Sequence, residues 1–339
     1  MKKKFFWLLM GLAITVTLAA CGTKSQEDVT KDLSSKLESL KSYKAEAKMT
    51  LQTGSEPQSY DIEIWHKNPE FYRVALKNTE KDQSQMILKN KEGVFVLTPA
   101  LNKSFRFQSD WPNNSSQAYL YESLIEDIQN DKEAKFKATE DHYVYETKTS
   151  YQNNQMLPLQ EITLNKSDLS PVSVKVMDAE RTPVVTVDFS NVKFNEELDN
   201  KDFDTKKNMT GAQLEFPVMA EVAEEEDFTV FYPESLPEVE LVSEKEVETE
   251  EGKRVILTYE GEDKSFTMIQ EKAVIVQTSG GEEAMMNGDP VDLGFTVGAV
   301  SDNMVSWTQN GVDYMIASTN LSKEEMIQIA QSVQGEVVK

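Results

Sequence analysis

Apolar residues recur at helical spacing in three segments of the chain and alternate with polar residues in most of the others. The spacing predicts an amphipathic helix over 27–40, whose apolar face consists of Val29, Leu33, Leu37 and Leu40. It predicts a second helix over 117–129, with an apolar face made of Leu120, Leu124, Ile125 and Ile128. A third is expected near the carboxyl end, where a capping box, Ser322 to Glu325, precedes Met326, Ile329, Ala330 and Val333.

Period-two alternation predicts strands on both sides of the second helix. The strands expected before it are 43–51, 60–64, 71–77, 85–89, 94–97 and 105–107. Those expected after it are 135–139, 142–149, 157–164, 172–177 and 184–194. An antiparallel sheet of this length has to curl and cover its apolar face, so the expected fold is α+β.

A shift to polar and acidic composition follows residue 199 and separates a second group of strands. These are expected at 228–232, 239–242, 254–259, 265–271, 294–300, 304–309 and 312–318. Asn310-Gly311 between the last two is typical of a two-residue hairpin. We therefore expect a signal segment at 1–20, a tether at 21–26, a first domain at 27–208, a linker at 209–226 and a smaller α+β domain at 227–339.

The amino terminus carries the most specific signal in the sequence. Lys2-Lys3-Lys4 precedes an apolar stretch over 5–19, and Leu18-Ala19-Ala20-Cys21 follows it. This pattern resembles a bacterial lipobox, in which the cysteine thiol receives diacylglycerol after cleavage. The alternatives are an ordinary signal peptide or a signal anchor, but the stretch is shorter than the roughly 20 apolar residues that span a bilayer. We expect a lipid-anchored protein on the extracytoplasmic face of the cell membrane, attached through Cys21.

Composition excludes several classes of function. The chain has 58 acidic against 35 basic residues, for a net charge of −23, and such a surface repels nucleic acid. A single cysteine excludes an internal disulfide and a cysteine-rich zinc site. His66 and His142 are the only histidines, and no metalloprotease, nucleophile-elbow, P-loop or dinucleotide motif occurs. Acidic runs at 224–227 and 246–251 are typical of solvated loops, so we expect no catalytic residues, no metal, no cofactor and no enzyme.

The apolar faces of the predicted strands offer a candidate ligand site. Residues 86–88 and 93–97 are apolar in both phases, which predicts strands covered on both sides. The candidate residues are Tyr43, Tyr60, Ile62, Ile64, Tyr72, Val74, Leu76, Met86, Leu88, Phe95, Leu97, Phe105 and Phe107. These side chains either line a concave cavity or fill a hydrophobic core, and the sequence leaves both alternatives open. A cavity able to enclose a sixteen-carbon acyl chain would gain on the order of 12 kcal/mol, at about 0.8 per CH₂.

Several local phrases carry a family resemblance over about 27–205. They are 40–51, 64–73 (Ile-Trp-His-Lys-Asn-Pro-Glu-Phe-Tyr-Arg), 93–99, 169–171 and 188–203. In order and content they resemble the LolA/LolB lipoprotein-carrier superfamily, and more closely the LolA-like sporulation lipoproteins of the YdcC type found in Firmicutes. The resemblance implies an incomplete antiparallel barrel, with helices as a lid over an apolar cavity that holds lipid or the acyl groups of a lipoprotein.

Two features depart from the carriers. Their lid latch uses a basic residue immediately before the proline of this phrase, where this chain has Asn68, and an amide cannot supply the forked charge of arginine. The soluble carriers also have no lipid anchor, whereas Cys21 would tether this chain. We therefore expect local handling of lipid or lipoprotein and not transport across a compartment.

Residues 227–333 resemble a small domain of unknown function appended to extracytoplasmic lipoproteins and anti-sigma-type regulators. Two domains in this order also resemble the RseB family of envelope sensors. The first hypothesis is accordingly a membrane-anchored protein that binds a hydrophobic ligand in envelope or sporulation-related biogenesis. The alternative is an RseB-like sensor that binds a membrane-protein partner, and an enzyme acting on wall glycan or lipid is a third.

The lipobox makes a direct prediction. Cys21→Ala removes the only thiol that could accept the lipid, so the variant should become soluble or secreted. Fractionation of cells followed by immunoblotting measures this. A variant that stays in the membrane fraction would contradict the lipobox.

Overall fold

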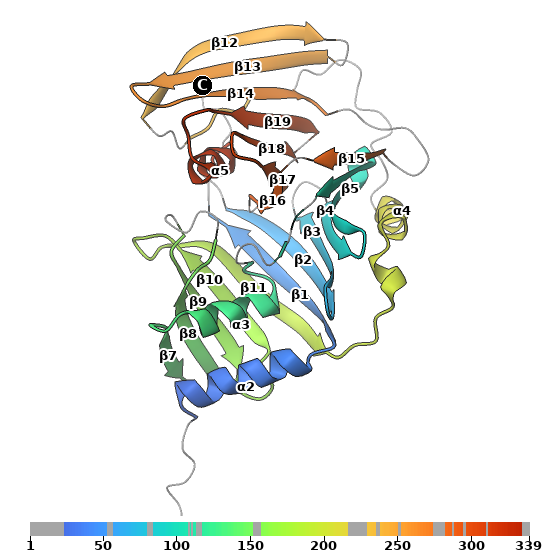
Figure 1. Cartoon of the computed structure of the whole chain (residues 1–339), viewed down its shortest axis with the longest axis vertical. Coiled ribbons are helices and arrows are strands. Elements are labelled where there is room, and N and C mark those ends of the chain that lie inside the picture. Colours follow the sequence, from blue (N-terminus) through green and yellow to red (C-terminus); the bar gives the residue numbers. More distant parts are fainter. Residues whose placement is uncertain are drawn as a thin grey trace, which may run out of the picture.

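The chain forms two β-sheets that share one hydrophobic core (Figure 1). The computed structural model describes residues 24–52, 57–79, 84–107, 109, 111–112, 117–151, 157–215, 229–234, 238–249, 252–273, 282–286, 288–293, 296–309 and 311–333. Cys21 and the lipobox therefore lie outside the described residues. Within them, no helix is both long and apolar enough to cross a bilayer.

The first sheet has twelve strands in the order β15-β6-β5-β4-β3-β2-β1-β11-β10-β9-β8-β7. The first six in the chain are β1 (Ser42–Leu51), β2 (Gln58–Lys67), β3 (Phe71–Asn78), β4 (Ser84–Asn90), β5 (Gly93–Thr98) and β6 (Lys103–Phe107). After the helical segment come β7 (Lys135–Ala138), β8 (His142–Lys148), β9 (Leu159–Asn165), β10 (Pro171–Met177) and β11 (Pro183–Phe194). The two ends of the sheet do not pair, so the expected incomplete antiparallel barrel is confirmed.

One strand of the first sheet comes from the second half of the chain. β15 (Glu282–Met286) pairs parallel with β6, with Glu282 opposite Lys103 and Met286 opposite Phe107. Sequence analysis did not predict this strand. Its pairing covers the backbone edge of β6, which would otherwise present unpaired N–H and C=O groups.

Two helices cover the concave face of the first sheet, as expected for a lid (Figure 1). α2 (Gln26–Ser39) starts at a capping box between Ser25 and Asp28, and α3 (Tyr121–Asn130) starts at Leu120. The four lid residues predicted from spacing are all buried, at 0–3% exposure: Leu120, Leu124, Ile125 and Ile128. The lid is therefore in contact with the sheet along its length.

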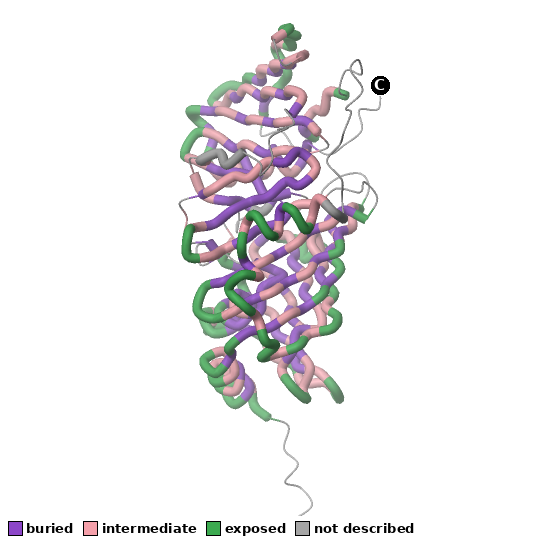
Figure 2. Tube along the Cα trace, turned by 90° about the vertical axis from the view of Figure 1, so that its right-hand side faces the viewer, coloured by how far each residue is buried: buried purple, intermediate pink, exposed green. Residues whose placement is uncertain are grey.

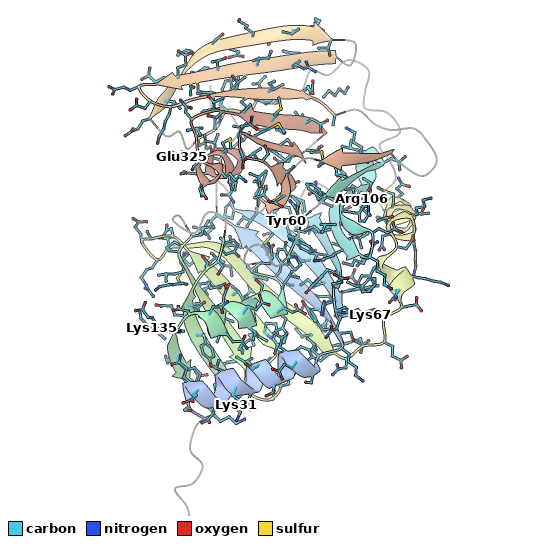
Figure 3. All side chains as sticks on the ribbon, viewed as in Figure 1. Lys31, Tyr60, Lys67, Arg106, Lys135 and Glu325 are labelled. Carbon is cyan, nitrogen blue, oxygen red and sulfur yellow. The ribbon has the colours of Figure 1, made fainter. Side chains whose placement is uncertain are left out.

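The convex face carries a helix where a linker was expected. The 3₁₀ helix η3 (Asn200–Phe203) buries Phe203 against Phe71, with ring centroids 5.4 Å apart. α4 (Thr205–Glu215) follows, so the start of the expected linker at 209–226 is helical, while 216–226 lie outside the described residues. Lys67 fixes this segment by donating to the Leu198 carbonyl at 2.9 Å and to Asn200 Oδ1 at 2.6 Å (Figure 3).

The second sheet has seven strands in the order β12-β13-β14-β19-β18-β17-β16. They are β12 (Val239–Thr249), β13 (Gly252–Gly261), β14 (Ser265–Lys272), β16 (Asp289–Asp292), β17 (Val297–Val300), β18 (Met304–Gln309) and β19 (Val312–Ala317). α5 (Lys323–Gln331) packs on β18 and β19, with the capping box predicted at Ser322. The strand expected at 228–232 was wrong, because its described residues, 229–232, join no ladder. β16 was not predicted; its four residues, Asp-Pro-Val-Asp, include one apolar side chain besides the proline.

A single hydrophobic cluster runs from the concave face of the first sheet into the second (Figure 2). Gln85 on β4 strengthens the junction: its Oε1 accepts hydrogen bonds from Thr296 Oγ1 at 2.7 Å and from the Val297 N–H at 3.0 Å. Lys103 on β6 forms an ion pair with Asp313 on β19, at 3.3 Å. The two domains therefore share a core and a polar seam.

Glu122, in the first turn of α3, connects the lid to the sheet. One carboxylate oxygen lies 3.0 Å from Nε2 of His66 on β2. The other accepts a hydrogen bond from the Tyr43 hydroxyl on β1 at 3.1 Å, and that hydroxyl accepts one from the Tyr121 N–H at 3.2 Å. Because burial disfavours charge, the pKa of Glu122 is raised to about 7 and the pKa of His66 is lowered to about 4. At neutral pH the contact thus holds a neutral imidazole against a half-ionised carboxyl group.

The two pKa shifts have opposite effects on stability. Between pH 4.5 and about 7, Glu122 keeps its proton in the folded state while the unfolded chain loses it. Its contribution to the free energy of unfolding therefore falls as pH rises. His66 loses its proton in the folded state above about pH 4 while the unfolded chain keeps it to 6.5, so its contribution rises with pH. In the wild type the two contributions offset each other.

Variants that remove one partner should separate these effects. In Glu122→Gln only the histidine contribution remains. The free energy of unfolding of this variant, compared with that of the wild type, should therefore increase as the pH is raised from 4.5 to 6.5. In His66→Phe it should instead fall over the same interval. Each change is roughly 2–3 kcal/mol, at 1.36 kcal/mol per pKa unit. Urea denaturation at several pH values measures both, and identical slopes in all three proteins would contradict the assignment.

Candidate functional site

Most of the predicted cavity residues meet on the concave face. Nearly all of these are buried in the main hydrophobic cluster, and Phe105 packs against it partly buried. The buried members of this group are Tyr43, Tyr60, Ile62, Ile64, Tyr72, Val74, Leu76 and Phe107. Side chains of α2, α3 and the segment before α3 pack onto the same cluster, including Trp111, Tyr119 and Tyr121, each at most 2% exposed. The concave face is therefore filled largely by the protein's own side chains.

Four of the predicted residues lie on the opposite face of the sheet. They form a separate cluster with Met209 of α4, and they are Met86, Leu88, Phe95 and Leu97. Successive side chains of a strand point to opposite faces, so neighbours such as Ile87 and Val96 belong to the concave cluster instead. The prediction of strands covered on both sides is confirmed, but these thirteen residues do not share one surface.

A cavity of about 210 Å³ remains on the concave side, beside the Glu122–His66 contact. Its lining includes the carboxylates of Glu122 and Glu126, the imidazole of His66 and the amide of Asn68. Asn68 donates to the Leu40 carbonyl at 3.1 Å and so holds the end of α2 in place. Asn68 thus contacts α2, whereas Glu122 and His66 connect α3 to the sheet. These polar groups make the cavity unsuited to a bare hydrocarbon chain.

The convex face carries a groove of about 840 Å³ between α4 and strands β1, β2, β3 and β11. Its apolar lining includes Trp65, Ala75, Leu76, Met86, Phe189 and Ala212. Its charged lining has both signs, with Glu46, Lys48, Asp61, Glu63, Arg73, Lys77, Asp188, Asp202 and Lys207. The groove exists because Phe203 and Met209 anchor η3 and α4 beside the sheet while the strands next to them keep polar outer faces.

Trp65 forms the centre of a three-strand row in this groove. The register places Lys44 of β1 on one side of it and Arg73 of β3 on the other. The Lys44 Nζ lies 3.7 Å from the indole centroid and the Arg73 Cζ lies 4.5 Å from it. Each contact is a cation–π interaction worth about 0.5–1 kcal/mol at an exposed site. The ring lies between two cations, and all three residues are partly exposed.

Other groups in the groove are paired with one another. Arg73 binds Glu63 and donates from Nε to Asn208 Oδ1 of α4 at 2.8 Å. Lys207 binds Asp202 at 2.9 Å, and the lysine lowers the pKa of that carboxyl group. The groove therefore offers fixed, compensated charges next to apolar surface, and this arrangement favours recognition over proton transfer.

No group of three or more histidine, cysteine or acidic residues able to hold a metal ion occurs in the described part of the chain. His142 is half-buried at the start of β8, away from the Glu122 contact. Sequence analysis missed the groove. The signal that could have indicated it was the polar phase of 44–48, 61–67 and 73–77, in which Trp65 is an unexpected aromatic residue among charges.

The chain is similar to several solved structures. The Pseudomonas aeruginosa MucA/MucB complex contains a chain 12% identical to this one, with a TM-score of 0.34; the match covers 91% of this chain and 98% of that one. A LolA superfamily protein from Nitrosomonas europaea is 14% identical, with a TM-score of 0.30, over 52% of this chain and 98% of that one.

Two family models match consecutive parts of the sequence. The model described as "Sporulation protein YdcC-like" matches residues 1–203, and one described as a domain of unknown function, DUF4367, matches residues 201–333. Sporulation protein YdcC of Bacillus subtilis strain 168 is 56% identical over 339 residues, which is 100% of this chain and 99% of that protein. The expected resemblance is confirmed, and the chain belongs to the sporulation protein YdcC-like family.

Proposed function

We propose that this chain is an extracytoplasmic, lipid-anchored binding protein that acts in sporulation by docking a partner polypeptide in the groove between α4 and the convex face of the sheet. One observation carries the proposal: the concave face is occupied by the protein's own side chains, whereas the convex face keeps a groove of about 840 Å³. Cys21 is the proposed point of membrane attachment. The partner would therefore be reached close to the membrane surface.

The lining favours a polypeptide over a hydrocarbon. A hydrocarbon chain would cover Lys48 and Asp61 without offering them any polar partner, and removing such groups from water is costly. An extended polypeptide can place an apolar side chain against Trp65 and Phe189 while its charged side chains meet the flanking acidic and basic residues. We assign no reaction to this site, because Arg73 and Lys207 are engaged with Glu63 and Asp202.

Acyl-chain binding beneath the lid is a second candidate function. The observation that favours it is the composition of the interface between α3 and the sheet, where Leu124, Ile125 and Ile128 pack on aromatic and aliphatic side chains. If α3 moved away from the sheet, this interface would become an apolar chamber. Release of the Glu122 contact with His66 and Tyr43 would have to accompany that movement.

Gly211 on α4 provides a direct test of the groove. It lines the groove, and a Cβ built there would meet nothing within 4 Å. Gly211→Trp should fill the groove without strain and favour the helix by a few tenths of a kcal/mol. We expect at least a tenfold drop in formation of heat-resistant spores when the variant replaces the wild-type protein. Thr210→Trp, at the neighbouring exposed position, is the matched control and should support normal sporulation.

A photo-crosslinking amino acid at position 211 should then form an adduct with one protein in sporulating cells, and the same amino acid at position 210 should not. Normal sporulation of Gly211→Trp together with equal crosslinking from both positions would overturn the groove proposal.

Lipid analysis separates the two candidate functions. Organic extraction of the Cys21→Ala protein, purified from cells, followed by mass spectrometry measures bound lipid without interference from the anchor. Docking on the convex face predicts less than about 0.1 mole of lipid per mole of protein. A stoichiometric lipid that is lost on Ile125→Glu, with Thr210→Glu as the exposed control, would instead support the chamber beneath α3.

A further inference from the structure

A small cavity of about 190 Å³ lies where the two domains meet, separate from the groove proposed to bind a partner. The first domain contributes Phe105 and Phe107 of β6 to its lining, and the second contributes Trp307 of β18 and Tyr314 of β19. Met286 of β15 lines it as well. The walls are therefore mainly aromatic and aliphatic, and both halves of the chain are needed to form them.

Trp307 brings an unused hydrogen-bond donor to this lining. Its side chain is stacked on Tyr314, with centroids 5.0 Å apart and an interplanar angle of 4°. The residue is only 4% exposed, and its Nε1 is buried with no hydrogen-bond partner. Buried indole N–H groups normally find a partner, because leaving a donor unsatisfied in a low-dielectric site costs free energy. Because Trp307 lines a cavity, a molecule bound there could supply the missing acceptor.

Most neighbouring polar groups are committed elsewhere, except Ser306 Oγ, which lines the cavity and is buried without a hydrogen-bond partner, as Trp307 Nε1 is. Gln85 accepts from Thr296 and from the Val297 N–H, and Lys103 is paired with Asp313. The ion pair contains one charge of each sign, so it does not select a charged ligand. A charged molecule would also lose its hydration against the aromatic walls without gaining a counter-ion. The complementary ligand is therefore uncharged.

We propose that this cavity binds a small, neutral, single-ring molecule that carries a hydrogen-bond acceptor such as a carbonyl group, which accepts from Trp307 Nε1. The volume fits this class, since a cavity of about 150 Å³ in another protein holds one benzene molecule. Because the lining comes from both domains, a bound molecule stabilises their arrangement in proportion to its occupancy.

Two probes of nearly equal shape test the proposal on the full mature chain. Acetophenone carries the carbonyl acceptor, and α-methylstyrene replaces that oxygen with a CH₂ group. Three tryptophans remain after residue 21, Trp65, Trp111 and Trp307, so ¹⁵N-labelled protein gives three indole N–H resonances. We expect acetophenone to shift one of them and to bind about tenfold more tightly than α-methylstyrene.

Trp307→Phe keeps an aromatic ring but removes the N–H donor. The shifted resonance should therefore disappear, and acetophenone and α-methylstyrene should bind about equally tightly. If that variant does not fold, Trp65→Phe and Trp111→Phe assign the three resonances by elimination in proteins that retain Trp307. Equal binding of both probes to the wild-type chain would overturn the proposal. So would the absence of any shift at the Trp307 resonance, which would mean that the cavity holds only water.

Discussion

The structure depends on one constraint, which is that an open, strongly curved sheet must remove its whole concave apolar face from water. The first eleven strands of the chain and β15 form that sheet, and its two ends do not pair to close it. α2 and α3 cover the half formed by β1 and β7–β11, and the second domain covers the region near β4–β6. Apolar burial at about 25 cal/mol per Å² makes this coverage the main source of stability for both domains.

The polar contacts within the covered face determine how the covering elements sit. Glu122 reaches His66 and Tyr43 from the first turn of α3, and Gln85 holds the loop that enters β17. The hydrogen bonds of Tyr43 to Glu122 and of Thr296 and Val297 to Gln85 satisfy groups that burial would otherwise leave unpaired, so each favours one position of its element over others. The parallel pairing of β15 with β6 has the same effect on the backbone. The two domains are thus connected by a common hydrophobic cluster, by the polar contacts of Gln85 and Lys103, and by the pairing of β15 with β6.

The convex face is covered only in part, by η3 and α4. Phe203 and Met209 anchor one side of η3 and α4, while the outward side chains of β1–β3 stay charged and partly wet. A groove results because the helix is fixed by two apolar anchors and by Asn208, not by a continuous interface. The result is a surface with compensated charges around an indole held between two cations, and this is the surface to which we assign the proposed partner.

Much of the fold could be predicted from local pattern. The helices at α2, α3 and α5, nearly all antiparallel strands of the first sheet and the buried lid residues follow from side-chain period, because one buried face imposes that period on the sequence. Strands β15 and β16 escaped prediction, and β15 pairs with a strand about 180 residues earlier in the chain, which no local pattern indicates. The family resemblance was likewise present in the residues themselves, from Ile64 to Arg73 above all.

Tertiary structure alone decided which face each apolar side chain joined. Met86, Leu88, Phe95 and Leu97 looked equivalent to Ile87 and Val96 in sequence, but the alternation of the strands sent them to α4 and not to the concave core. The convex groove, the Glu122–His66 contact and the cavity at Trp307 each join residues that are far apart in the sequence. Glu122 is 56 positions from His66, and Thr296 is 211 positions from Gln85. A sequence determines which groups need burial or a partner, whereas only the folded chain determines which distant segment supplies it.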